Sequence, residues 1–221
     1  RGRVFFRSSL HDVDREPTRL RGVMPLANVE RATTNPKLKR TMDEQLQGFL
    51  EFFRQIGAED VEHSGKTYLA HAGGVYRDLK KWGCEEDVCR AGLFHSIYGT
   101  QMFQGFTLPL DRRGELAALI GERAERLAYR FCAMDRPKFD QTVFREEPPY
   151  PYRDRVTDET VELPQQDVDD LCTLQVCDWL EQIERLQMWD HRHAAFEQMA
   201  RRLGGVAWEN FQRVFANAPV A

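Results

Sequence analysis

Apolar residues recur at helical spacing along most of this chain, and this periodicity limits its fold more than any other feature. The first pattern runs from Thr41 to Ile56 and ends at Gly57, a typical helix stop. Similar patterns predict further helices over 64–82, 85–97, 113–134 and 167–188 and two shorter ones that carry Phe196, Met199 and Leu203 or Phe211, Val214 and Phe215. We therefore expect a mainly α fold, a single helical domain of about seven helices.

Two segments interrupt the helical pattern. Residues 1–40 contain three prolines and keep no period, so we predict an extended N-terminal arm that packs on its own domain or on another chain. Residues 135–164 contain five of the ten prolines, which predicts an irregular, proline-rich insertion with a small hairpin at 155–161. The expected organisation is an arm (1–40), a helical domain (41–190) and C-terminal helices packed on it (191–221).

Composition excludes several classes of protein. The 221 residues include 31 Lys+Arg and 35 Asp+Glu, a net charge of −4, and the mean hydropathy is −0.58, so no window has the roughly 20 uncharged apolar residues of a membrane span. Both signs of charge are interspersed, which is not the basic stripe of a nucleic-acid-binding protein. The five cysteines form no CxxC pair, which indicates a reducing compartment inside the cell rather than secretion.

Two histidines lie on predicted buried faces. His71 precedes Val75 and Leu79 by four and eight residues, and His95 follows Ala91 by four, so each imidazole shares a helix face with core residues. A single buried histidine is commonly a core residue satisfied by a hydrogen bond. Two on consecutive helices also suit a metal ion, because facing imidazoles otherwise lose solvation. Both interpretations stay open at this stage.

Asp178 is the carboxylate that would complete such a site. It follows Leu171 by seven residues and Leu174 by four, at the edge of an apolar stripe, where an ionised carboxylate needs a partner. The alternative is a partly exposed residue paired with an arginine such as Arg130 or Arg185.

These residues carry a family resemblance. The segment Tyr68–Val75 (YLAHAGGV), with Ala91–Thr100 (AGLFHSIYGT) about twenty residues later, resembles the metal-binding core of the HD superfamily and looks closest to the alarmone (ppGpp) hydrolases of the RelA/SpoT type. In that family a histidine, a His-Asp pair on the next helix and a later aspartate hold one divalent metal, typically manganese, iron or zinc. The resemblance covers residues 45–190 and is strongest over 63–132.

Carried over residue by residue, the resemblance implies that His71 and His95 are metal ligands and that Asp178 is the last aspartate. Ser96 stands where the family has the aspartate of the His-Asp pair, and the segment 93–100 with 120–128 is similar to a less characterised HD-related family that shows the same His-Ser. An acidic pair of the alarmone hydrolases is replaced by Gly99 and Thr100.

The substitutions have a chemical consequence. A neutral hydroxyl at Ser96 ligates weakly, so two imidazoles and one carboxylate would leave open positions, a set that suits iron or manganese. Without acidic groups at 99 and 100 nothing there would position water on a phosphorus ester, so standard HD hydrolysis is not expected.

Five further residues are candidate ligand-binding groups. Ser96 and Thr100 occupy the altered motif, and His63 precedes the second helix, where a cap or a surface role is the alternative. Arg112 and Arg113 could face an anionic ligand; the alternative is surface pairing with glutamates at helical spacing, such as Glu115.

Two functions remain open from sequence. The first is a degenerate HD-fold protein with a pocket for one divalent metal (Fe, Mn or Zn) or a small ligand, which would act as a hydrolase or an oxygenase if it is an enzyme. The second is a non-catalytic pseudoenzyme without metal, a subunit of a larger assembly that contacts protein partners through the arm and the proline-rich loop.

Overall fold

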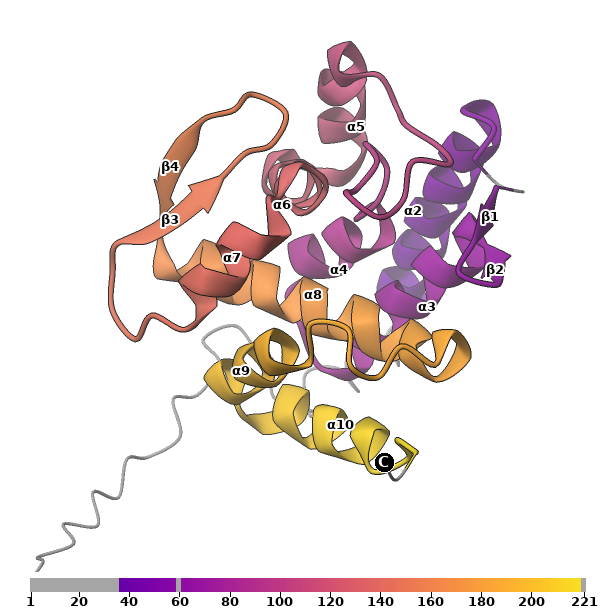
Figure 1. The fold of residues 1–221 in the computed structure, drawn as a ribbon. Coiled ribbons are helices and arrows are strands. Elements are labelled where there is room, and N and C mark those ends of the chain that lie inside the picture. The colour runs from indigo at the N-terminus through magenta and orange to yellow at the C-terminus, as the bar shows by residue number, and fades with distance from the viewer. Residues whose placement is uncertain (1–35, 59–60, 220–221) are drawn as a thin grey trace, which may run out of the picture.

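The computed structural model describes residues 36–58 and 61–219 (Figure 1). Over these ranges the chain folds into a mainly α single domain, as the periodicity predicts, with nine α-helices rather than about seven. In chain order the elements are α2 (Pro36–Gln55), β1 (Glu62–His63), β2 (Lys66–Thr67), α3 (Tyr68–Lys81), α4 (Glu86–Leu93), the 3-10 turn η1 (Leu110–Arg112), α5 (Arg113–Ile120), α6 (Glu122–Ala133), α7 (Arg136–Val143), β3 (Tyr150–Arg153), β4 (Thr160–Leu163), α8 (Gln165–Leu186), α9 (His193–Leu203) and α10 (Gly205–Phe215).

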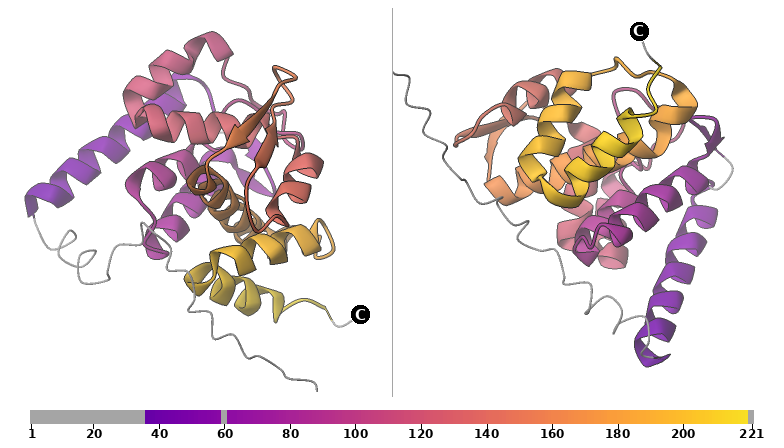
Figure 2. Two further views of the ribbon diagram at one scale, coloured as in Figure 1. Left: turned by 90° about the vertical axis from the view of Figure 1, so that its left-hand side faces the viewer. Right: turned by 90° about the horizontal axis from the view of Figure 1, so that it is seen from below.

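Helix α8 is the central element. Its 22 residues pack against α3, α4 and α6 and also against α9 and α10. Figure 2 shows α9 and α10 side by side as a pair that covers α8 from below, while α2 to α6 lie on the other side. Because α8 is covered from both sides, most of its residues are buried.

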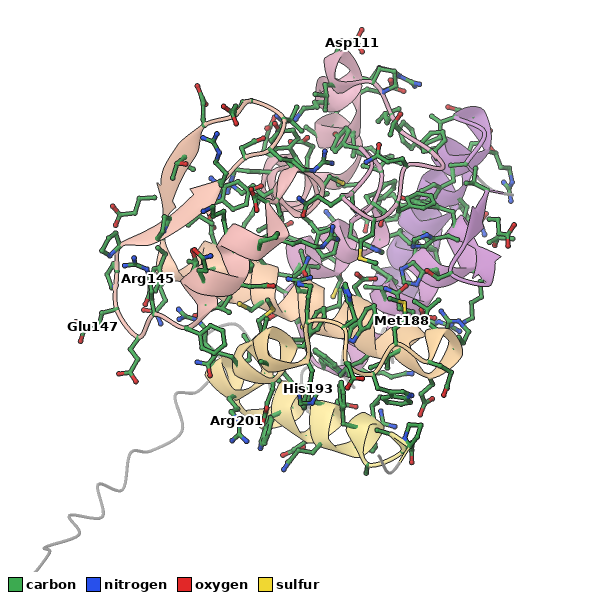
Figure 3. The ribbon with its side chains drawn as sticks, in the orientation of Figure 1. Asp111, Arg145, Glu147, Met188, His193 and Arg201 are labelled. Carbon is green, nitrogen blue, oxygen red and sulfur yellow. The ribbon has the colours of Figure 1, made fainter. Side chains whose placement is uncertain are left out.

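The interior consists of two clusters of buried apolar side chains. One surrounds α8, α9, α10 and the β3–β4 hairpin, and the other lies between α2, α4, α5 and α6. His95 lies between the two clusters. Its ring centroid is 5.0 Å from that of Phe131, which belongs to the first cluster, and its backbone carbonyl accepts a hydrogen bond from the thiol of Cys132, which belongs to the second. The polar site described below therefore lies between two apolar bodies. Figure 3 shows side chains filling this interior, with residues such as Asp111 and Glu147 at its exposed periphery.

The predicted long helix over 113–134 is two helices. Gly121 separates α5 from α6 with φ +98° and ψ 148°, a conformation that L side chains rarely adopt. The amphipathic pattern continues across the break because both helices bury one face, with Ile120 and Ala124 fully covered. The spacing of apolar residues alone did not reveal the break.

The proline-rich segment is ordered, which corrects the expected irregular insertion over 135–164. The Asp135 side chain caps α7 and Pro137 occupies its first turn, where proline is tolerated. The hairpin exists, but its strands overlap the predicted segment 155–161 only at residues 160–161, and Tyr150 lies opposite Leu163 in antiparallel register. Side-chain burial decides this register, since Tyr150 and Tyr152 both point into the core.

Three helix boundaries also differ from prediction. Helix α2 includes residues 36–40, which the sequence pattern assigns to the arm; residues 1–35 of the arm lie outside the described residues. Helix α3 begins at Tyr68 rather than at residue 64, because the Thr67 side chain accepts from the Ala70 amide and caps the helix, whereas Ser64 lies in the β1–β2 turn with φ 50°. The helix predicted over 85–97 ends at Leu93, so His95 lies in the following turn.

No helix within the described residues is long and apolar enough to cross a membrane. The five cysteines are unpaired, and four of them are buried.

Candidate metal centre

His71 reaches the interior from the first half of α3. This helix buries one face, on which His71, Val75 and Leu79 follow one another at four-residue intervals, and the His71 side chain is fully covered. The helical period that predicted this position is local, so the sequence alone sufficed to place the imidazole in the core.

His95 enters from the turn that follows α4. Its side chain is 1% exposed, and its Nδ1–H donates to the Gly92 carbonyl at 2.7 Å. This bond leaves Nε2 as the nitrogen that faces His71, at 3.2 Å from the Nε2 of that residue. The backbone of α4 thus fixes the orientation of the His95 ring.

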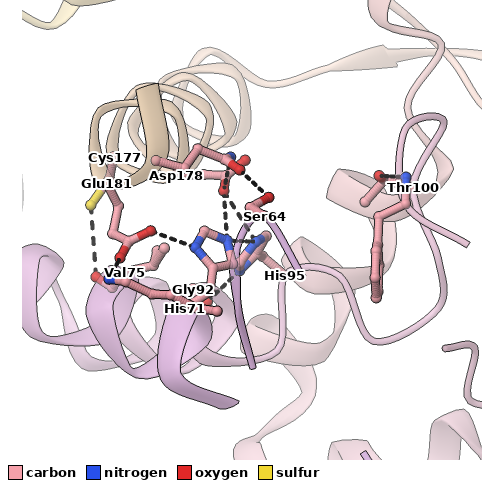
Figure 4. A network of polar contacts seen from close by, with 12 residues as sticks. Ser64, His71, Val75, Gly92, His95, Thr100, Cys177, Asp178 and Glu181 are labelled. Carbon is pink, nitrogen blue, oxygen red and sulfur yellow. Dashed lines mark hydrogen bonds and ion pairs between the residues drawn. The ribbon is translucent and has the colours of Figure 1, made fainter. Parts of the chain in front are cut away.

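Asp178 of α8 completes a triangle with the two imidazoles (Figure 4). Its Oδ1 lies 3.0 Å from His71 Nε2 and 3.3 Å from His95 Nε2. The three residues are far apart in the chain, and α3, the turn after α4 and α8 each contribute one. The Gln182 amide donates to the same Asp178 oxygen at 2.9 Å and accepts from the Ser64 hydroxyl at 2.7 Å, which holds the carboxylate in place.

The separations of these three atoms fit one metal ion. Metal–ligand bonds of about 2.1 Å at angles of 90–109° place neighbouring ligand atoms about 3.0–3.4 Å apart. The distances of 3.0, 3.2 and 3.3 Å among the two Nε2 atoms and Oδ1 fall in this range. Two imidazoles and one carboxylate are also a donor set that first-row metals accept.

Glu181 is a site residue that the sequence analysis missed. Its Oε2 accepts from His71 Nδ1 at 2.6 Å, the arrangement by which a carboxylate orients a metal-binding histidine. Lys66 and Arg185 hold the same carboxylate at 2.8 and 2.7 Å. Two features of the sequence pointed to Glu181. It follows Asp178 by three residues, and residue 74 is a glycine, which leaves room for the Glu181 carboxylate because a Cβ there would lie 2.7 Å from Glu181 Oε1.

His71 and the carboxylates Asp178 and Glu181 shift each other's pKa values toward the charged forms. Burial disfavours the protonated form of His71, but hydrogen bonds to Asp178 and Glu181 outweigh burial and raise the pKa of His71 to about 9. Burial also opposes ionisation of Asp178, yet His95 and His71 hold the pKa of this carboxyl well below its usual range. The pKa of Glu181 is lowered to about 2 despite burial, through His71, Arg185 and Lys66. The centre thus combines two ionised carboxylates with a His71 imidazolium at neutral pH, which must release a proton before its Nε2 can bind a metal ion.

His63 approaches the same point from strand β1. Its ring centroid lies 4.6 Å from that of His71 and 4.2 Å from that of Phe103. One nitrogen from each of His63, His71 and His95 lies within 4.8 Å of the others, so these three could hold a metal ion together. Burial, followed by the neighbouring His71 and His95, lowers the pKa of His63 to about 4. A neutral imidazole is the form that binds metal.

A cavity of about 280 Å³ opens beside Asp178. Of the candidate ligand-binding residues, His63, Ser96 and Thr100 line it. Ser96 and Thr100 are buried, and the Thr100 hydroxyl accepts from the amides of Met102 and Phe103, which shapes the loop around the cavity. A bound molecule would therefore lie next to the metal centre.

Arg112 and Arg113 do not line this cavity. Arg112 pairs with Glu115 at 2.8 Å on the surface, the alternative that helical spacing allowed. Arg113 forms two hydrogen bonds with the buried Glu125, at 2.7 and 2.9 Å, and lies over the Tyr129 ring. Both guanidinium groups are therefore engaged in ion pairs within the chain and do not face a ligand in this cavity.

A comparison with protein families gives one match, to a family described as "Domain of unknown function (DUF6817)", over residues 52–136. The matched region contains His63, His71 and His95 and ends before α8, which carries Asp178 and Glu181. No curated protein and no solved structure matches the chain.

Proposed function

We propose that the chain is a degenerate HD-like domain that binds one divalent metal through His71, His95 and Asp178 and acts on a small molecule in the adjoining cavity. The observation that carries this proposal is the triangle of two Nε2 atoms and one carboxylate oxygen with sides of 3.0, 3.2 and 3.3 Å. His63 could supply a fourth nitrogen. Iron, manganese and zinc suit this set of donors.

Each residue has a distinct task in this proposal. Glu181 orients His71, the Gly92 carbonyl orients His95, and Gln182 holds Asp178. A metal so held would supply Lewis-acid chemistry to an oxygen of the bound molecule. Ser96, which replaces the aspartate of the HD motif, adds a neutral hydroxyl to the cavity wall, so an open position remains for a ligand.

A second candidate is a non-catalytic role, in which the same residues form a polar core cluster of an interaction subunit. One observation favours it: His71 is bracketed by two carboxylates at 3.0 and 2.6 Å, so the cluster is electrostatically satisfied as an ion-pair network without metal. In this reading the protein partners would contact the N-terminal arm and the 135–164 segment. Under either function we place the protein in a reducing compartment, because its five cysteines are unpaired.

Metal analysis distinguishes the two functions. The purified chain is stripped with chelator, incubated with Fe²⁺, Mn²⁺ or Zn²⁺, desalted and measured by elemental analysis. We expect about one ion per chain in the native protein and a loss of binding in Asp178→Asn. Asp190→Asn makes the same chemical change at an exposed position and serves as the matched control.

Three results would favour the polar cluster instead. The native chain could retain none of the three metals, Asp178→Asn could retain as much metal as the native chain, or only Ser96→Asp could acquire metal, which would identify a lapsed HD site. Far-UV circular dichroism and thermal melting of each variant verify that loss of metal is not loss of fold.

A further inference from the structure

Three residues that line one cavity each carry a buried hydrogen-bond donor with no acceptor among the described residues. The donors are Nη1 of Arg136, Nε2 of Gln175 and the indole Nε1 of Trp179, and all three residues line the cavity beside Asp178. Their exposed fractions are 7%, 2% and 4%. Buried polar groups are normally satisfied, so three unsatisfied donors around one cavity indicate that something outside the described residues accepts from them.

Neighbouring side chains fix the orientation of two of these donors. The Gln175 carbonyl oxygen accepts from Arg192 at 2.9 Å, which leaves its amide NH₂ unpartnered at the cavity wall. The Trp179 indole stacks on Phe196, with ring centroids 5.3 Å apart and an interplanar angle of 4°. Such donors are preorganised, because little side-chain entropy remains to be lost when a ligand binds.

Arg136 also brings a positive charge that no carboxylate of the described residues pairs with directly. Its guanidinium lies 5.6 Å from the centroid of the Phe131 ring, and the neighbouring Arg192 is already paired with Asp140. Burial and the neighbouring Arg192 lower the pKa of Arg136 to about 10, so the group stays charged at neutral pH. The carboxylate that acts on it electrostatically is Asp178, which is engaged by His71 and His95. A buried, uncompensated cation favours an anionic ligand.

The rest of the cavity limits the size and character of that ligand. A volume of about 280 Å³ is at the small end of ligand pockets, so it fits a small metabolite. Apolar side chains line much of the wall: Phe103, Phe131, Phe196, Leu186 and Met188. Met188, labelled in Figure 3 on the segment after α8, is 40% exposed and lies at the edge of the cavity.

We propose that this cavity binds the carboxylate or phosphate group of a small organic anion through Arg136, Gln175 and Trp179, with the apolar part of the molecule against the phenylalanines. All three donors offer hydrogens and no lone pairs, so their common partner is an acceptor, and the charge of Arg136 favours an oxyanion as that acceptor. This inference rests on the proposed function only in that the bound molecule would lie beside the metal centre; the three donors do not depend on the metal ligands.

The test measures the rise in melting temperature of the chelator-treated protein with inorganic phosphate or butyrate, each compared with chloride at equal ionic strength. A ligand that binds the native state raises the melting temperature according to its concentration and Kd. We expect at least one of the two anions to stabilise the native chain beyond chloride, and the anion that does so identifies the group that is bound. If neither exceeds chloride up to 100 mM, the proposal is wrong.

Two variants assign the effect to the donors. Arg136→Met removes the charge and keeps an apolar stem, so it should weaken binding at least tenfold. Without anion it should melt at or above the native temperature, because a buried uncompensated charge is gone; a structural arginine would instead lower it. Trp179→Phe removes only the N–H and keeps a ring that stacks on Phe196, and it should weaken binding about 3- to 10-fold. Native-like anion response in both variants would overturn the assignment.

Two controls separate this inference from the metal proposal. Arg201→Met changes an exposed arginine that pairs with Glu197 outside the cavity, and it should respond to anion like the native chain. Asp178→Asn should retain the anion response even though it loses metal. If the chelator-treated Asp178→Asn protein loses the anion response, the response depends on Asp178 rather than on the three donors, and the assignment fails.

Discussion

A methyl group added at Gly92 tests the close approach of α3 and α4 on which the metal centre depends. A Cβ at this position would lie 2.2 Å from Leu79 Cδ1 and 3.3 Å from Val75 Cγ1. Carbon atoms in favourable contact are about 3.5–4.0 Å apart, so the first contact is more than about 1 Å too short. Leu79 and Val75 are both fully buried, so Leu79 can relieve the overlap only by moving against other side chains of a packed core.

The expected magnitude follows from two opposing contributions. Replacement of glycine by alanine within a helix stabilises by about 0.5–1 kcal/mol, whereas an extra carbon in a packed core costs about 1–3 kcal/mol. With an overlap this large we expect Gly92→Ala to lower the free energy of unfolding by about 1–2 kcal/mol. Gly73→Ala is the matched control, because Gly73 lies within α3 and nothing is within 4 Å of its added Cβ. It should be stabilised by about 0.5–1 kcal/mol.

Urea unfolding followed by circular dichroism measures both free energies, with the slope checked for constancy. The same change should also weaken metal binding in Gly92→Ala and not in Gly73→Ala, because the Gly92 carbonyl holds the His95 ring through a 2.7 Å hydrogen bond. If Gly92→Ala were as stable as Gly73→Ala, the close contact between α3 and α4 would not exist as described and the placement of His95 would lose its support.

Three further predictions concern other parts of the fold. Arg113→Met should lower the free energy of unfolding by about 2 kcal/mol, because it removes the ion-pair partner of the buried Glu125 and leaves the hydrogen bond from the Tyr98 hydroxyl. Arg112→Met, which loses only an exposed pair, should leave urea unfolding unchanged. Burial raises the pKa of Asp170 from 3.8 to about 6, so its contribution to stability is fully present below about pH 4 and is lost as the pH rises through about 6; Asp170→Asn should remove this decline from a stability–pH curve. The cysteines should react slowly with a thiol reagent at pH 8 until denaturant is added, since burial raises even the pKa of the half-buried Cys84 to about 12; prompt reaction of the native protein would contradict the described burial.

Much of the fold could be predicted because helices are local structures. A period of 3.6 residues placed the buried faces of α3 and α8, and with them His71 and Asp178. The break at Gly121 could not be predicted in this way, because the apolar period continues on both sides of a residue whose backbone alone changes direction. The order within 135–164 was also missed, since proline content forbids a long helix but does not forbid a short one or a hairpin.

The sequence by itself determined the helical class of the domain and the burial of His71, because both follow from spacings within one helix. His95 is buried as predicted, but it lies in the turn after α4 and not on the helix whose spacing predicted it. Only the tertiary structure decided that Asp178 lies 3.0 Å from His71 and that Glu181 orients the same ring, since these contacts join residues more than 100 positions apart. It alone also gathered the donors of Arg136, Gln175 and Trp179 around one cavity. The physical reason is that long-range packing sets which helix faces meet, whereas the period of a sequence records only which residues share a face.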